Sequence, residues 1–207
     1  MGFGKKKKPE AAVSCSQDDV CRLAQEALRK TRSMRLRLPL LLTLTAPLLM
    51  QRWTSKAVRK MLGKMVGMPE PKEHKDLTKD FEESWYRNER AEAVVPCRII
   101  KAALVEAAIS TGGVVTKADL RRSCRVLGNT APLKGGEKTM DVKIVRNATG
   151  GPDVRARASF PTGTSLEVVL EFVSPLTTDQ VISAIEAAGA SIGLCEWRPE
   201  RGGDFGS

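Results

Sequence analysis

The residues best suited to chemistry in this sequence are basic side chains that gather in three places along the chain. Four of them follow a helix-capping residue at helical spacing, three lie in a long polar segment, and two lie near the C-terminus. Arginine and lysine grouped in this way bind phosphates. The candidate phosphate-binding residues are Lys56, Arg59, Lys60, Lys64, Arg121, Arg122, Arg125, Arg198 and Arg201.

A solvated surface is the alternative explanation for much of this charge. A helix that packs its apolar side on the core leaves its basic side in water, with or without a ligand. For Arg155 and Arg157, which lie in a predicted strand, we expect cross-strand ion pairs with Glu167 and Glu171 rather than contacts with nucleic acid. Trp85 offers a ring for base stacking, but its spacing from Phe81 favours burial beside a short helix.

The charge is concentrated at one end of the chain. Residues 1–66 carry 15 lysines and arginines against 4 acidic residues, a net +11, whereas residues 67–207 carry 19 against 20, a net −1. Such a field attracts nucleic acid or anionic lipid, although a solubilising tail before a neutral domain would show the same asymmetry. The N-terminal arm has one lysine cluster, at residues 5–8, and no strongly amphipathic helix. Membrane docking is therefore the weaker hypothesis.

The sequence lacks the residue sets that enzymes use. It has one histidine, His74, no phosphate-binding G-x-x-x-x-G-K-[ST] motif and no G-x-S-x-G nucleophile motif. Its five cysteines are odd in number and without a C-x-x-C pair, which predicts free thiols in a reducing compartment. We therefore expect a protein that is not an enzyme and needs no metal and no cofactor.

The most apolar run, residues 38–50, is too short to cross a membrane. It spans 13 residues and contains Pro39 and Pro47, whereas a spanning helix needs about 20 apolar residues. It also begins too late for a signal peptide and lacks a small-residue cleavage site. We expect no membrane insertion and a cytoplasmic location.

Hydrophobic periodicity and turn residues define the expected elements. The expected helices begin at Thr54 or Ser55, within residues 69–92, at Pro96 and at Ser174, and Gly189 is expected to end the last of them in a left-handed conformation. The expected strands are residues 34–50, 140–146, 154–160, 166–173 and 190–197, with a long basic loop at 116–138.

This element order predicts an α+β fold. Strand, helix, two strands, helix, strand is the β-α-β-β-α-β order of a ferredoxin-like antiparallel sheet, here with helical and loop insertions. We expect a basic arm at residues 1–33, partly disordered or helical, and a domain at 34–207 with an insertion at about 67–139. The helices should cover one face of the sheet and leave the other for nucleic acid or a neighbouring subunit.

Three segments resemble a widespread protein family encoded by tailed bacteriophages. They are TAPLLMQRW at residues 45–53, DVRARASFP at 153–161 and AGASIGLCEWRPERGGDFG at 188–206. The similarity covers about residues 36–206, and the WRPE-x-GG-x-FG ending is its most specific part. Gln51 stands where the family commonly has histidine.

That family in turn resembles the RAMP superfamily, ferredoxin-like proteins that form the backbone of CRISPR effector complexes. The resemblance implies a subunit that polymerises along single-stranded nucleic acid, held by basic side chains and a glycine-rich loop near the last strand. A chain that is only 4% aromatic should bind through phosphates rather than by stacking bases.

Two functions therefore follow as hypotheses. The first is sequence-tolerant binding of single-stranded DNA or RNA by a homo-oligomer or filament, in phage DNA metabolism or an RNA-guided-like complex with other subunits. The second is a structural or assembly subunit of a virion or multiprotein complex, in which the basic arm is an accessory. Assembly that requires an oligonucleotide distinguishes the first from the second.

Overall fold

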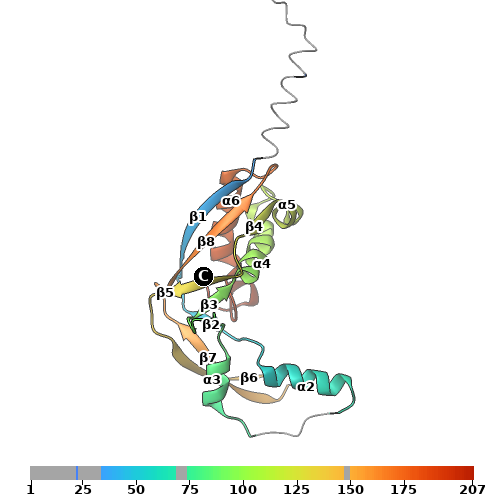
Figure 1. Cartoon of the computed structure of the whole chain (residues 1–207), viewed down its shortest axis with the longest axis vertical. Coiled ribbons are helices and arrows are strands. Elements are labelled where there is room, and N and C mark those ends of the chain that lie inside the picture. Colours follow the sequence, from blue (N-terminus) through green and yellow to red (C-terminus); the bar gives the residue numbers. More distant parts are fainter. Residues whose placement is uncertain (1–21, 23–33, 69–73, 147–149) are drawn as a thin grey trace, which may run out of the picture. The chain divides into compact units, whose positions relative to one another are not determined.

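A computed structural model of the chain describes residue 22 and residues 34–68, 74–146 and 150–207. The chain divides into two units, Met1–Met34 and Arg35–Ser207, and all the elements named below belong to the second (Figure 1). The basic arm expected at residues 1–33 lies outside the described residues except for Arg22, which is helical and exposed. The predicted domain boundary and insertion stay predictions.

The second unit contains both helices and short strands along its whole length. The α-helices are α2 (Ser55–Met65), α3 (Leu77–Glu83), α4 (Cys97–Ala107), α5 (Lys117–Ser123) and α6 (Thr178–Ala187); shorter helical segments are η1 (Ala108–Thr111), η2 (Ala188–Ile192) and η3 (Pro199–Arg201). The strands are β1 (Leu36–Thr43), β2 (Leu48–Met50), β3 (Val94–Pro96), β4 (Cys124–Val126), β5 (Thr130–Lys134), β6 (Thr139–Arg146), β7 (Pro152–Phe160) and β8 (Ser165–Phe172).

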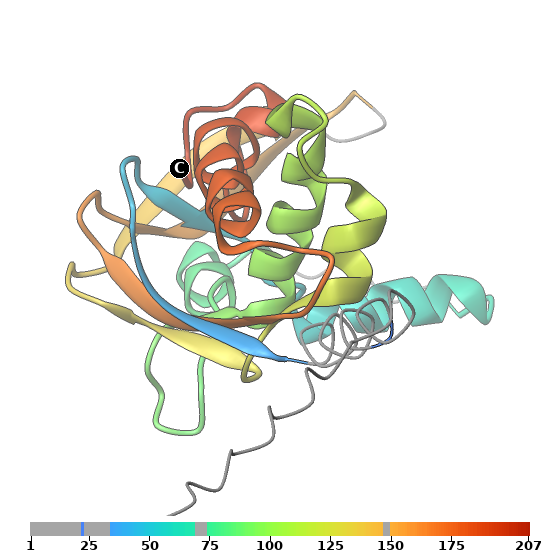
Figure 2. The same ribbon diagram turned by 90° about the horizontal axis from the view of Figure 1, so that it is seen from above.

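The larger sheet is built around β8. It runs in the order β1-β8-β5-β3, and β4 pairs with β8 on the same side as β5, all antiparallel. Side chains alternate along β8, so that Leu170 and Phe172 point towards helices α4 and α6, where Leu104 and Val181 are also buried. Figure 2 shows these helices on one side of the sheet. The other face carries Glu171.

The smaller sheet runs in the order β2-β7-β6, again antiparallel. Its long β6–β7 hairpin pairs Thr139 with Ser159 and Arg146 with Pro152 at the two ends. A hydrophobic cluster that includes Met50, Ala158 and Leu166 contains residues of both sheets. The α+β class with antiparallel sheets is therefore confirmed.

The predicted last strand is absent from residues 190–197. This segment begins in η2, a π-helical turn, and only Glu196 makes an isolated bridge, to Leu49. Gly193, Cys195 and Trp197 have φ values of 71°, 63° and 53°, which a strand cannot contain. Gly189 likewise does not stop α6, because the chain continues into η2 and turns at Gly193. The specific ferredoxin-like order is thus not established.

The apolar run expected to form one buried strand is instead two strands in different sheets. The chain bends between Leu44 and Pro47, and only the short β2 is fully buried. β1 is half-exposed and, among the described strands, pairs with β8 alone, so it lies at the edge of this sheet. An edge position explains how Pro39, which lacks an N–H, is accommodated within it.

Helix α2 forms where it was expected, but its apolar side is not part of the core. Thr54 caps the helix, its side-chain oxygen accepting a hydrogen bond from the Ala57 N–H at 3.1 Å. No residue of α2 is buried among those that the structure describes. The expectation of a core-packed helix with a solvated basic back is therefore wrong for this helix.

The central segments largely follow the predictions. α4 begins after Pro96 and its continuation η1 ends at Gly112, which is left-handed with φ 64°. Trp85 is buried in the core, as the spacing from Phe81 favoured. The expected basic loop at 116–138 contains α5, but also the strands β4 and β5, which sequence patterning missed because they are short.

Candidate nucleic-acid interface

A polar cleft of about 860 Å³ lies between the β6–β7 hairpin and the C-terminal segment. Its lining combines the end of the hairpin with residues 195–198 and 201–203. Six of its lining residues carry a charged side chain, and five of those are arginines. They are Arg146, Arg155, Arg157, Arg198 and Arg201, against the single carboxylate of Glu196. This concentration of guanidinium groups makes the cleft a candidate anion site.

Arg157 lies at the base of this cleft and is only 1% exposed. Its Nη1 atom is 3.1 Å from a carboxylate oxygen of Glu196, yet neither Nη1 nor Nε has a hydrogen-bond partner within the described part of the chain. Burial lowers the pKa of Arg157, and the nearby Glu196 charge partly offsets that effect. A buried guanidinium with unpaired donors is costly, since its hydration is lost without replacement.

The β6–β7 hairpin determines which side chains surround Arg157. Arg157 pairs in register with Asp141, and Arg155 pairs with Lys143, so these four side chains share one face of the hairpin. Arg155 donates from Nε to Asp153 at 3.1 Å, and Lys75 also bonds Asp153. These contacts, that of Lys75 first, lower the pKa of Asp153 and keep it ionised.

Glycines hold the C-terminal segment in the shape that closes the cleft. The Gly203 N–H donates to the Arg198 carbonyl at 3.2 Å, and the Phe205 N–H donates to the Trp197 carbonyl at 3.0 Å. A Cβ at Gly203 would lie 1.9 Å from the Trp197 carbonyl oxygen, so only glycine fits. In the WRPE-x-GG-x-FG motif, Gly203 is therefore required by close contact, while Gly202 has a left-handed φ of 71° that favours glycine.

Aromatic rings support the cationic wall beside Arg157. The Lys143 ammonium lies 4.7 Å from the Trp197 ring centroid and 4.6 Å from that of Phe205, and the two rings meet edge to face at 6.3 Å. The Arg157 guanidinium is 5.6 Å from the Trp197 ring. These contacts fix the cations by cation–π attraction, and they also occupy the Trp197 ring.

Arg198, directly before the short helix η3, and Arg201, its last residue, complete the cleft. Arg198 forms an ion pair with Glu200 at 2.5 Å, and its buried Nε atom has no hydrogen-bond partner among the described residues. Cys195 also lines the cleft, and burial raises the pKa of its thiol to about 12. The thiol is therefore neutral at physiological pH and leaves the positive charge of the cleft unchanged.

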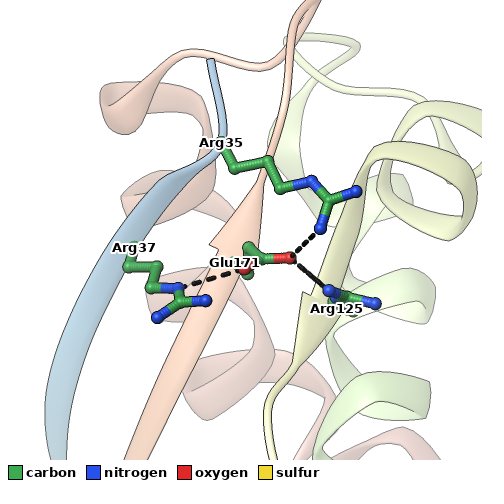
Figure 3. A network of polar contacts seen from close by, with 4 residues as sticks. All are labelled: Arg35, Arg37, Arg125 and Glu171. Carbon is green, nitrogen blue, oxygen red and sulfur yellow. Dashed lines mark hydrogen bonds and ion pairs between the residues drawn. The ribbon is translucent and has the colours of Figure 1, made fainter. Parts of the chain in front are cut away.

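A second charged cluster lies on the open face of the larger sheet (Figure 3). Glu171 of β8 is 4% exposed and accepts hydrogen bonds from Arg37 of β1 at 3.0 Å and Arg125 of β4 at 2.9 Å. Arg35 is a third cation at 3.9 Å. The bonds from Arg37 and Arg125 lower the pKa of Glu171, so its carboxylate stays ionised.

Comparison with known proteins shows a partial likeness to solved structures. No family model matches the sequence, and no curated protein matches it. A chain in the cryo-EM structure of the Type III-B Cmr-beta bound to cognate target RNA is similar at 11% identity and a TM-score of 0.49. The match covers 92% of the present chain and 64% of that chain, so the present chain spans less than two thirds of its length. At this similarity the likeness tells us nothing of what the present chain binds.

The structure places the nine predicted site residues on four parts of the fold. Lys56, Arg59, Lys60 and Lys64 lie on α2, Arg121 and Arg122 lie exposed in the last turn of α5, Arg125 lies on β4, and Arg198 and Arg201 line the cleft. Arg125 is bonded to Glu171 rather than carried on a loop. Only the last two of the nine line the cleft around the buried arginine.

Three cleft arginines were not among the predicted site residues: Arg146, Arg155 and Arg157. The expected ion pairs of Arg155 and Arg157 with Glu167 and Glu171 are wrong, because β7 pairs with β6 and β2 and not with β8. The available signal was the alternation in residues 153–157, DVRAR, which places both arginines on one strand face. The strand face that the two arginines share indicates a site only when the segments that lie against it are known, and the sequence does not reveal them.

Two further expectations concern metals and membranes. Within residues 34–68, 74–146 and 150–207, histidine, cysteine and acidic side chains form no group of three or more that could hold a metal ion. Cys97, Cys124 and Cys195 have free thiols. Among the described residues, the helices are too short or too polar to span a membrane.

Proposed function

We propose that the Arg35–Ser207 unit binds single-stranded nucleic acid through its phosphates, with the arginine cleft as the principal site. The observation that carries this proposal is Arg157, a buried guanidinium at the base of the cleft whose Nε and Nη1 atoms lack hydrogen-bond partners. A phosphate supplies the acceptor oxygens and the negative charge that these donors need.

The charge balance of the cleft also favours an anionic ligand. Five arginines and Glu196 give the lining a net charge of +4, and the ion pairs of Arg155 with Asp153 and of Arg198 with Glu200 reduce this surplus to +2. A volume of about 860 Å³ lies within the range of pockets that enclose whole small molecules, so a nucleotide with its phosphate fits. A structural ion pair alone would need neither the additional arginines nor the space.

The position of Arg157 favours a single strand over a duplex. Because Arg157 is buried, its phosphate must enter the cleft, and a flexible single strand can bend to place it there. The Trp197 ring contacts Lys143, lies near Arg157 and is 40% exposed, and a base stacked on it would be held without regard to its identity. Binding should therefore depend on phosphates and little on base sequence.

The proposal also covers the basic residues outside the cleft and the setting in which the protein acts. The basic residues of α2 and α5, including Lys60, Lys64, Arg121 and Arg122, would extend the positive path beyond the cleft. We propose no catalytic activity, a cytoplasmic location and a homo-oligomer on DNA or RNA. A phage or RNA-guided-like setting is proposed on the family resemblance alone.

Fluorescence anisotropy with labelled single-stranded DNA and RNA of unrelated sequences tests the proposal. If four phosphates are neutralised, affinity should fall about fiftyfold between about 50 and about 200 mM salt. Arg157→Met should weaken binding at low salt by about thirtyfold or more, since it removes the buried member of a charge pair. Glu196→Gln should strengthen binding, because it removes the carboxylate that competes with phosphate for Arg157.

Arg90→Met is the matched control for the binding measurement. Arg90 is exposed in the turn before β3 and outside the cleft lining, and its replacement causes the same change in net charge. It should leave affinity within about twofold of the parent protein. Absence of binding at low salt, or equal losses in Arg157→Met and Arg90→Met, would refute the cleft as the binding site.

A structural or assembly subunit is the second candidate function. It is favoured by the exposed apolar side chains of α2, which include Met65 at 77% and Val66 at 69% exposure. Size-exclusion chromatography with and without oligonucleotide separates the candidates. Assembly that incorporates the oligonucleotide supports the nucleic-acid binder, and assembly of a chain that binds no oligonucleotide supports the structural subunit.

A further inference from the structure

Helix α2 exposes an apolar surface that the described part of the chain does not bury. Met61, Leu62 and Met65 lie on neighbouring turns and are 41%, 53% and 77% exposed, and Val66 directly after the helix is 69% exposed. Methionine adapts its shape to an apolar surface and is frequent where proteins dock. An exposed patch of this kind marks an interaction surface.

The same chain contains an unfilled apolar groove of about 650 Å³. Leucines of β1 form one wall, and the α6–η2 segment with the C-terminal residues forms the other. Leu42, Leu104 and Ile185 are among the apolar side chains that line it. Glu186 is the one charged residue in this lining, so the groove is suited to apolar side chains rather than to a polar ligand.

Charge complementarity relates the two surfaces. Helix α2 carries four basic residues and no acidic residue, including Lys60 and Lys64. Helix α6, which borders the groove, carries Asp179 and Glu186 and no basic residue. A basic amphipathic helix placed in this groove would bury its apolar side while its charges met opposite charges at the rim.

One molecule does not bring these surfaces together in the structure. Figures 1 and 2 both show α2 well apart from α6. With 11 residues, α2 is about 16 Å long, and three of its apolar side chains face one side. We propose that α2 of one molecule docks in the apolar groove beside α6 of a second copy.

This contact joins two different surfaces, so it is head-to-tail. A head-to-tail contact leaves one free α2 and one free groove on every dimer, and further copies can therefore add to either end. The groove and the Met61–Met65 face share no residue with the arginine cleft. Self-association should consequently occur without nucleic acid, so its failure and the failure of the proposed nucleic-acid binding are separate outcomes.

Light scattering coupled to size-exclusion chromatography of the full chain, without oligonucleotide, gives the first test. The mean mass should rise with protein concentration above that of a monomer. Leu62→Asp with Met65→Asp should raise the concentration needed by at least about tenfold, since the charged groups lose water on docking. Both residues are exposed, so the monomer itself should keep its stability.

A groove variant provides the complementary half of the test. Glu186→Arg with Ala190→Arg reverses the charge at the rim and adds a cation, and both positions are exposed. It should weaken self-association to a similar degree. Mixed in equal amounts, the α2 variant and the groove variant should form a dimer that grows no further, because each retains one intact surface.

Ile109→Asp is the matched control, since Ile109 is 72% exposed and lies outside both surfaces. It should assemble like the parent protein. A parent protein that stays monomeric at all concentrations overturns the proposal. So does assembly that survives both double variants, or a mixture of the two that gives no dimer.

Discussion

Two buried charges in this molecule differ in how completely their neighbours pair with them. Glu171 and Arg157 are 4% and 1% exposed, and each lies among arginines. Around Glu171, three cations converge on one carboxylate, and Arg37 and Arg125 both hydrogen-bond to it. Arg157 forms one ion pair, with Glu196, and lies near the carboxylates of Asp141 and Asp153, but two of its nitrogen atoms have no hydrogen-bond partner in the described structure.

The difference separates a structural cluster from a candidate site. The arginines around Glu171 are 61–68% exposed, so they keep much of their hydration while they neutralise the buried carboxylate. Arg157 has lost its hydration and has gained too few partners in exchange. A buried charge with surplus partners stabilises the fold, whereas a buried charge with too few gives up stability for a ligand.

The largest expected effect comes from removing the central charge of the structural cluster. In Glu171→Gln the three arginines lose their common anion and repel one another, so Tm at neutral pH should fall by roughly 5 °C. Differential scanning calorimetry measures this change. An unchanged Tm would show that the cluster contributes nothing to stability, and the contrast with Arg157 would fail.

The pH dependence of the same pair of proteins sharpens this prediction. The pKa of Glu171 is lowered in the folded state, so the carboxylate stabilises the fold above its unfolded-state pKa, about 4.3. This stabilisation disappears as pH falls below that value towards the folded-state pKa. The Tm difference between parent and Glu171→Gln should therefore be full at pH 7 and shrink on acidification below about pH 4.

The local elements were largely predictable, because their signals lie within a few residues. Helix α6 has a capping box in which Thr177 and Gln180 bond each other's backbone, and β6, β7 and β8 lie between clear turn residues. What the sequence did not reveal is which strands pair. β8 follows β7 after a short turn, yet it pairs with β1, more than 120 residues earlier.

That long-range pairing is the reason why the candidate site could not be found from the sequence. A hairpin of β7 with β8 would have placed Arg157 near Glu167 and made a simple ion pair. In the observed pairing, Glu171 instead accepts a hydrogen bond from Arg37, and Arg157 lies beside the C-terminal segment. Two positive φ values at Cys195 and Trp197, which local sequence does not signal, then turn that segment over the cleft.

A stability change of intermediate size and opposite sign, a gain, is expected on replacing Arg157. Arg157→Met replaces a buried and poorly paired charge with an apolar side chain of similar length, so the free energy of unfolding should rise by about 1 kcal/mol. Glu196 is 32% exposed and remains hydrated without its partner. Urea denaturation of the variant, measured without nucleic acid, provides the value.

The matched change for this measurement is Arg37→Met, which removes an arginine that has a satisfied hydrogen bond to Glu171. It should not stabilise the protein. If Arg157→Met proves as destabilising as the loss of a buried paired charge, then Arg157 is a structural residue and the contrast between the clusters disappears.

The smallest effect is expected at the periphery of the Glu171 cluster. Arg35 is 68% exposed and its Nη1 atom lies 3.9 Å from Glu171, too far for a hydrogen bond. Since Arg37 and Arg125 already bond the carboxylate, Arg35→Gln should change the free energy of unfolding by less than about 0.5 kcal/mol. Urea denaturation at low and high salt measures it. A larger loss of stability would mean that the third arginine is needed to neutralise Glu171. The Glu171 cluster would then have no more partners than it needs, and its contrast with Arg157 would weaken.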